Sequence, residues 1–228
     1  MKNERDRMEH VYQARRALAS RYRLDNPGNK FNYEHLQLGL ARRLTQTFPT
    51  LDTIRCLDIG SGTLFWPEEL IRIGVRRDYC FGADLLISRL KEGYAAGRHL
   101  PVVACSAAQL PFPDSSFHLV TQFTMMTSVM DPSLRKTIAS EIRRVLAPGG
   151  YIFWYDFRYN NPANRNTRAI GRREIEALFS GMRGEFETLT LLPPLARKLK
   201  GPLTPLLKFF HLLPILRSHY LALIGPKG

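Results

Sequence analysis

The sequence predicts an α/β protein with a doubly wound, mostly parallel sheet. Short apolar segments typical of buried strands alternate with amphipathic segments typical of helices between residues 54 and 156. A glycine-bearing turn, Gly60-Ser61-Gly62, directly follows the first of these strands and comes just before a helix. Hydrophobic residues make up 44% of the 228 positions, enough for a sizeable core. Such a sheet binds its ligands at the carboxyl ends of the strands.

Two helical segments precede the first strand. Over residues 3–23 apolar side chains, Leu18 among them, recur at helical spacing, so we expect an apolar stripe on the core or over a pocket. The tetrapeptide Asn26-Pro27-Gly28-Asn29 is expected to break this helix. A second helix is expected over 33–48 and ends at Pro49. Residues 1–50 are therefore predicted to form a helical cap on a domain spanning residues 51–228.

The following elements alternate along the chain. The helix expected over 132–146 is the best marked, because Asp131 can cap it, Pro132 suits its first position and Gly149-Gly150 follow its end. Helices are also expected at 67–73 and 86–98, and strands at 54–59, 79–83, 101–105, 117–123 and 151–155.

The C-terminal part adds a short helix from Gly171 and strands at 186–192 and 219–224, which we expect to pair antiparallel. The segment 193–214 between these strands differs in kind, with five prolines, four basic residues and no acid among many leucines and phenylalanines. We expect it to be an insert that covers the site as a lid. Its cationic, leucine-rich character also suggests contact with a membrane or a lipid-like acceptor.

Composition and charge narrow the functional classes. No run of about 18 apolar residues exists and the N-terminus lacks the apolar stretch of a signal peptide, so we expect a cytoplasmic protein, peripheral at the inner face of the membrane if 193–214 contacts it. The net charge of +13 suggests an anionic partner, but the arginine doublets are spread over the whole chain. Histidines show no ligand spacing with acids, so no metal is assigned.

Four ordered motifs resemble those of class I S-adenosylmethionine-dependent methyltransferases of the small-molecule, methyltransferase-11-like type. They are Asp58-x-Gly60-x-Gly62, Asp84 at the end of the second strand, Leu110–Val120, and Glu141–Gly150. A dinucleotide fingerprint would instead need a glycine at position 65, where Phe65 stands. The resemblance implies a Rossmann-like, seven-stranded sheet with the last strand antiparallel. It also implies S-adenosylmethionine as cofactor and S-adenosylhomocysteine as product.

Carried over position by position, the resemblance implies a cofactor site at the strand ends. The turn would hold the methionine part, Asp84 the ribose, and the segment after the third strand would border adenine. That segment has Ser106 where an Asp commonly precedes the Ala, and His118 likewise stands where many relatives have Asp. The cofactor-binding residues so predicted are Asp58, Gly60, Ser61, Gly62, Thr63, Asp84, Leu85, Ser106, Ala107, Gln109, Gln122, Phe123 and Thr124.

The acceptor is expected beyond the fourth and fifth strands, where in-line displacement would move the methyl group. Asp156 is the candidate general base, because it follows a buried strand where desolvation raises a carboxyl pKa. A cap or an ion pair with Arg158 is the alternative. Tyr155 and Tyr159 are expected to hydrogen-bond or line the pocket.

Several functions stay open at this point. We expect a small-molecule, glycan or lipid-linked acceptor, methylated at oxygen. Alternatives are an RNA or DNA methyltransferase that uses the basic surface, a non-catalytic cofactor-binding partner subunit, and a nicotinamide-dependent oxidoreductase. Nucleic acid has the weaker support, because no Asn/Asp-Pro-Pro-Tyr/Phe tetrad follows the fourth strand. The sequence does not indicate the oligomeric state.

Overall fold

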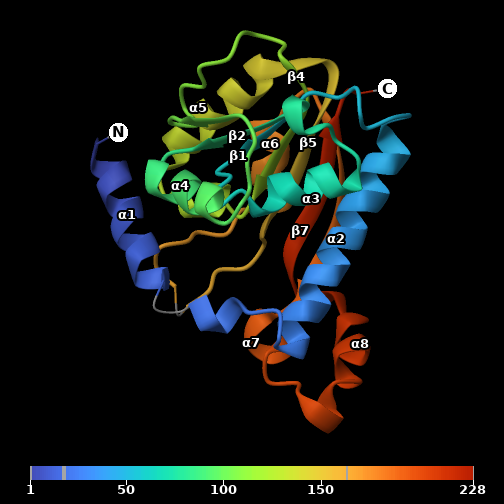
Figure 1. Ribbon diagram of the computed structural model, residues 1–228. Helices are drawn as coiled ribbons and strands as arrows, with labels where there is room; N and C mark the ends of the chain where they lie inside the picture. The colour runs from blue at the N-terminus through green and yellow to red at the C-terminus, as the bar shows by residue number, and fades with distance from the viewer. Residues whose placement is uncertain (1, 17–18, 163, 228) are drawn as a thin grey trace.

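The computed structural model describes residues 2–16, 19–162 and 164–227, so Leu18 of the first predicted helix lies outside it. Seven strands form one sheet in the order β3-β2-β1-β4-β5-β7-β6 (Figure 1). Strand β7 pairs antiparallel with both β5 and β6, and the other pairs are parallel. The predicted doubly wound sheet with an antiparallel last strand is confirmed. The strands are β1 Cys56–Ile59, β2 Cys80–Asp84, β3 Val102–Ala104, β4 Phe117–Phe123, β5 Leu146–Phe157, β6 Arg183–Leu191 and β7 Arg217–Gly225.

Helices cover both faces of the sheet and bury two apolar layers. On one face Leu36, Leu40 and Leu44 of α2 pack against sheet residues. On the other, Ile138 and Ile142 of α5 pack with Trp154 and its neighbours. The helices are α1 Lys2–Arg16, α2 Pro27–Thr47, α3 Phe65–Ile73, α4 Ile87–Ala95, α5 Pro132–Val145, α6 Arg172–Leu178, α7 Pro193–Ala196 and α8 Leu206–His211.

The tetrapeptide at 26–29 starts a helix rather than only ending one. Asn26 caps α2, because its Oδ1 accepts hydrogen bonds from the backbone N–H of Gly28 at 2.9 Å and of Asn29 at 3.3 Å. Pro27 takes the first helical position, where its missing N–H costs nothing. At Gly28 a Cβ would overlap the Ala196 carbonyl oxygen, so α2 approaches the C-terminal insert through a glycine.

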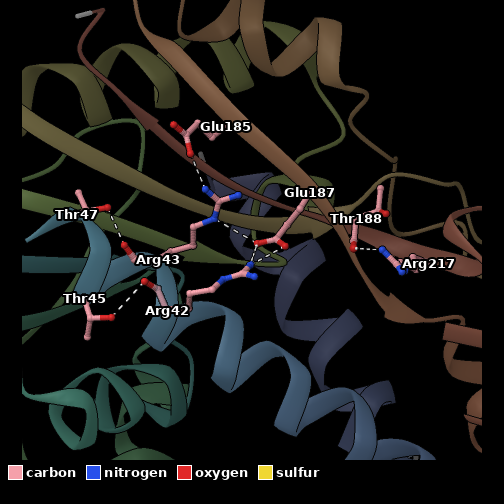
Figure 2. Close-up of polar contacts among 8 residues, drawn as sticks. All are labelled: Arg42, Arg43, Thr45, Thr47, Glu185, Glu187, Thr188 and Arg217. Atoms are coloured by element: carbon pink, nitrogen blue, oxygen red, sulfur yellow. Dashed lines mark hydrogen bonds and ion pairs between the residues drawn. The ribbon is translucent and has the colours of Figure 1, made fainter. Parts of the chain in front are cut away.

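Figure 2 shows how one arginine doublet is used. Arg42 Nη2 lies 2.5 Å from Glu187 Oε1, and Arg43 contacts both Glu187 and Glu185, at 2.6 Å from the latter. Such partly exposed pairs each contribute about 0–1 kcal/mol. They fasten α2 to β6, so these two cations do not form a free anion-binding patch.

The segment between β6 and β7 leaves the sheet at the edge where β1, β4 and β5 end. Strand β6 runs parallel to β5, since both are antiparallel to β7. Figure 1 shows α7 and α8 protruding beyond this end of the sheet. In the part of the chain that the structure describes, no helix is both long and apolar enough to cross a bilayer.

Candidate functional site

The carboxyl ends of β1, β2 and β4 enclose a cavity, here called the glycine-turn cavity, of about 90 Å³. Its floor is formed by strand ends and by the turn that follows β1, and α1 lies across it. The lining residues are Glu4, Met8, Tyr12, Ile59, Gly60, Ala83, Asp84, Leu85, Leu86, Cys105, Ser106, Ala107, Phe123, Met125, Ser128, Val129, Leu134 and Ile138.

The turn itself needs its first glycine. Gly60 has φ +73°, a conformation that side-chain-bearing residues rarely adopt. A Cβ at this position would also lie 2.5 Å from Met125 Cγ. The backbone N–H groups of Gly60 and Ser61 both donate to the Ala83 carbonyl, at 2.7 and 3.1 Å, which locks the turn onto the end of β2.

Asp84 ends β2 with its carboxylate at the cavity wall. Each of its oxygens accepts one backbone N–H at 2.8 Å, from Gly62 and from Leu86. Burial raises its pKa, against the lowering effect of these two hydrogen bonds and of the Arg89 guanidinium. A carboxylate has about four acceptor positions, so each oxygen can still accept a ligand hydroxyl. Asp84 is therefore fit to hold the two hydroxyls of a ribose.

Asp58 lies deeper, beneath the turn, and does not line the cavity. Its Oδ1 accepts a hydrogen bond from Thr121 Oγ1 at 2.6 Å. Burial raises its pKa to about 8, and the nearby charge of Asp84 acts in the same direction. Such a carboxyl takes up a proton at neutral pH unless a cation comes close.

Helix α1 is the part of the site that the motifs did not indicate. Arg7 Nη2 donates to the Ser128 carbonyl at 2.6 Å and pairs with Glu4. The Arg89 guanidinium lies 4.6 Å from the centre of the Tyr12 ring. The predicted apolar stripe does lie over a pocket, with Met8 and Tyr12 in its wall.

A second, larger cavity of about 550 Å³ lies beside the first, and we call it the tyrosine cavity. Ser128 lines both cavities, and its buried Oγ has no hydrogen-bond partner among the described residues. The two cavities therefore share a lining residue just beyond the end of β4. The tyrosine cavity is lined by Tyr22, Leu24, Asn29, Asn32, Tyr33, Thr124, Ser128, Tyr155, Phe157, Tyr159, Asn160, Asn161, Pro162, Asn164, Thr167, Thr190, Leu192, Pro193, Pro194, Arg197, Ser218 and His219.

Hydrogen bonds to Ser218 indicate which nitrogen of the His219 imidazole carries the proton. The Ser218 hydroxyl donates to the Thr190 carbonyl at 3.1 Å, so it must accept from His219 Nδ1, which lies 2.8 Å away. We infer from this that Nδ1 carries the proton and Nε2 keeps its lone pair. The imidazole stacks on the Tyr155 ring at 4.6 Å and 2°. Burial lowers its pKa to about 3, so the ring is neutral.

Asp156 lies outside both cavities. Its carboxylate accepts from the N–H and the hydroxyl of Thr127, at 3.0 and 2.6 Å, and from the N–H of Phe157 at 2.9 Å. Burial raises its pKa to about 6, and these hydrogen bonds oppose the rise. Arg158 instead donates to the Pro214 carbonyl. This geometry orders the loop after β4 and presents no base to a ligand.

The predicted site residues fall into two sets. Nine lie at the cavities: Gly60, Asp84, Leu85, Ser106, Ala107 and Phe123 line the glycine-turn cavity, and Thr124, Tyr155 and Tyr159 line the tyrosine cavity. The others, which line neither cavity, are Asp58, Ser61, Gly62, Thr63, Gln109, Gln122 and Asp156. Gln122, for example, is buried, and its Oε1 accepts from the N–H groups of Met125 and Met126.

Among the residues that the structure describes, no group of three or more His, Cys, Asp or Glu is placed to hold a metal ion. His219 and Ser128 are the contributors that sequence reasoning missed, whereas α1 was expected as an apolar stripe over a pocket but without named site residues. None of them belongs to a spaced motif.

Comparison with known proteins relates the central part of the chain to methyltransferases. Residues 57–154 match the family model described as a methyltransferase domain. The chain is 30% identical to the demethylmenaquinone methyltransferase of Mycolicibacterium vanbaalenii over 148 residues, 65% of this chain and 59% of that protein. The chain thus spans about three fifths of the length of that relative.

Solved structures agree on the fold. A S-adenosylmethionine-dependent methyltransferase from Archaeoglobus fulgidus superimposes with a TM-score of 0.59 at 16% identity, covering 84% of this chain and 94% of that one. The geranyl diphosphate C-methyltransferase of Streptomyces coelicolor, solved with Mg²⁺, geranyl diphosphate and S-adenosylhomocysteine, has a TM-score of 0.60 at 19% identity, over 82% of this chain and 75% of that one.

Proposed function

Because the chain carries a class I S-adenosylmethionine-dependent methyltransferase domain, we propose that it methylates a hydroxyl group of a small-molecule, glycan or lipid-linked acceptor. One observation carries the proposal. Ser128 lines both cavities, so a donor in one and an acceptor in the other would lie close together near the end of β4.

The glycine-turn cavity is the proposed cofactor site. Asp84 would accept the ribose hydroxyls, and the turn at Gly60 would face the methionine part, whose ammonium Asp58 would attract from below. Leu85 and Ala107 supply apolar walls for adenine, beside the Ser106 hydroxyl. The cavity volume is smaller than the roughly 300–1,000 Å³ of ligand sites, so we expect α1 to shift on binding.

In the tyrosine cavity we propose that His219 binds the acceptor hydroxyl. Bound S-adenosylmethionine supplies an electrophilic methyl group on a sulfonium sulfur. As the acceptor oxygen forms its bond to carbon its proton becomes strongly acidic, and even a weak base such as neutral His219 can take it through Nε2. None of the described residues that line this cavity is an Asp or a Glu, so we propose His219 as the base in place of Asp156. Asp156 instead positions Thr127 through a hydrogen bond.

The lining suggests the kind of acceptor. Five asparagines line the cavity, and buried Asn32 Oδ1 has no hydrogen-bond partner among the described residues, which suits a polar head group. The cavity also reaches Leu192 and two prolines at the base of the insert, which suits an apolar tail. A relative named demethylmenaquinone methyltransferase supports a lipid-linked acceptor, which the enzyme would meet at the inner face of a membrane.

Titration calorimetry with S-adenosylmethionine and S-adenosylhomocysteine tests the cofactor site. We expect micromolar binding that is lost in Asp84→Ala and kept in Asp78→Ala, an exposed aspartate just before the same strand. Absence of heat with both ligands would reject the proposal. Transfer of labelled methyl from the cofactor to a panel of hydroxyl-bearing lipids and glycans would then identify the acceptor, and transfer to none would favour a non-catalytic partner subunit.

Nucleic acid is a weaker second candidate. It rests on the net charge of +13, but Arg42, Arg43 and Arg144 are engaged in ion pairs with Glu or Asp. Tight binding of RNA or DNA in a gel shift, with a steep dependence on salt concentration, would support this candidate.

A further inference from the structure

The insert between β6 and β7 carries a concentrated apolar surface, here called the insert face. Of thirteen exposed large hydrophobic side chains among the described residues, six fall in this segment of the chain. Phe209 is 58% exposed, Leu212 71% and Ile215 73%. The insert face consists of Leu203, Leu206, Phe209, Leu212, Leu213 and Ile215. A patch of this density marks an interaction site more often than a plain solvent surface.

The insert face is held firmly in place. Leu207 is buried in a small cluster with Phe31 of α2 and Leu191 of β6, while its neighbours Leu206 and Phe209 point outward. Arg217 Nε donates to the His211 carbonyl at 2.7 Å, which ties the end of α8 to β7. The outward side chains therefore do not belong to a segment that could simply fold inward.

The segment that carries the insert face also carries three lysines without ion pairs among the described residues. Lys198, Lys200 and Lys208 are exposed, and no ion pair among the described residues involves them. The chain contains no acid from Thr188 to its end. This differs from the arginine doublet on α2, whose charges are neutralised by glutamates. Lysines around an apolar surface can extend their charges to anionic head groups while the apolar side chains enter the acyl boundary.

The insert that carries this face also contributes to the proposed acceptor cavity. Leu192, Pro193, Pro194 and Arg197, at the root of the insert, line the tyrosine cavity. Figure 1 shows α7 and α8 together at one end of the molecule. An acceptor could therefore keep its tail in a bilayer touching the insert face while its head group enters the cavity.

We propose that the insert face is a docking surface for an anionic lipid bilayer. The argument that the bilayer supplies the acceptor rests on the proposed function, but the docking itself does not. Three lysines, six exposed apolar side chains and the absence of acids favour a negatively charged membrane over a protein partner or a second copy.

Sedimentation with vesicles tests this directly. The full chain is expected to bind phosphatidylcholine vesicles containing about one third phosphatidylglycerol, and to bind pure phosphatidylcholine at least ~10-fold more weakly. Phe209→Ser/Leu212→Ser/Ile215→Ser should reduce binding more than ~10-fold. Lys198→Gln/Lys200→Gln/Lys208→Gln should reduce it by about 5-fold per lysine at low salt.

Matched controls keep the test sharp. Lys91→Gln/Lys136→Gln/Lys227→Gln removes the same charge from exposed positions elsewhere and should leave most of the binding. Leu38→Ser removes a 68% exposed apolar side chain outside the insert and should change nothing. All altered positions are exposed, and unchanged melting temperatures would verify folding.

Three results would overturn the inference. The first is vesicle binding that is unaffected by both insert variants. The second is no vesicle binding by the full chain, and the third is self-association that the insert variants abolish. Calorimetry with S-adenosylmethionine on the same samples separates the two proposals, because intact cofactor binding with no membrane binding rejects only the docking surface.

Discussion

Replacing Asp58 by asparagine tests whether the buried carboxyl under the turn is part of the cofactor site. Its pKa is raised from 3.8 to about 8 by burial. Between these values the folded protein holds a proton that the unfolded chain has released, so the free energy of unfolding falls as pH rises. Each pH unit in this window corresponds to about 1.4 kcal/mol, which makes the destabilisation at pH 8 up to about 5 kcal/mol.

The amide that replaces the carboxyl in Asp58→Asn cannot ionise, so this loss should disappear. The difference in unfolding free energy, variant minus wild type, should grow by up to about 5 kcal/mol from pH 4 to pH 8. Any constant cost of the new amide cancels in this comparison. Urea unfolding at several pH values measures it. Asp156→Asn is the matched control, and its effect should be complete near pH 6, where that carboxyl titrates.

Cofactor binding adds an independent measurement. The positive charges of S-adenosylmethionine should ionise Asp58, so binding at pH 7 should release about one proton from the wild type and none from Asp58→Asn. Calorimetry in two buffers of different ionisation heat counts the protons. Asp156→Asn should release as many protons as the wild type. A pH-independent stability difference together with no proton release would refute the reasoning.

Two further predictions concern the cavities. His219→Phe keeps the stacking on Tyr155 but removes Nε2, so kcat should fall by about 10²-fold or more with cofactor affinity unchanged. His99→Phe is the control and should have wild-type activity. Equal kcat in both variants would exclude His219 as the base. Arg7→Ala removes the hydrogen bond to the Ser128 carbonyl that helps hold α1 over the cavity. Association of S-adenosylmethionine, measured by stopped flow, should therefore be about 10-fold faster. An unchanged rate would show that α1 opens without breaking this contact.

Much of the fold follows from patterns local in the chain. The strand predicted at 117–123 is observed at those residues, and six of its seven residues are buried, as expected for a strand inside a mostly parallel sheet. The helix expected over 132–146 is observed as α5, with Asp131 as its cap. Element ends were less predictable. The tetrapeptide at 26–29 starts α2. Its Gly28 is needed because a side chain there would overlap the backbone of Ala196, which lies far along the sequence.

The cofactor side of the site was more predictable than the acceptor side, because its residues depend on neighbours in the sequence. Gly60 is required by the geometry of the turn, and Asp84 stands at the end of a strand, and both features can be recognised in a short stretch of sequence. His219 acquires its role from Ser218, Thr190 and Tyr155, which come from three strands and meet only in the sheet. Asp156 had the expected burial, but strand alternation places its carboxylate on the opposite side from Tyr155.

The two cavities are linked by the backbone after β4. Phe123 lines the glycine-turn cavity, Thr124 the tyrosine cavity, and Met125 the first cavity again. Thr124 has φ +58°, a conformation that costs about 1 kcal/mol or more for a β-branched residue and persists only if its surroundings impose it. Gln122 supplies that constraint, since its side chain accepts from the N–H of Met125 at 3.1 Å and donates to the Tyr155 carbonyl at 3.4 Å. Gln122 thus touches neither cavity, yet it aligns the wall through which both proposed substrates would meet.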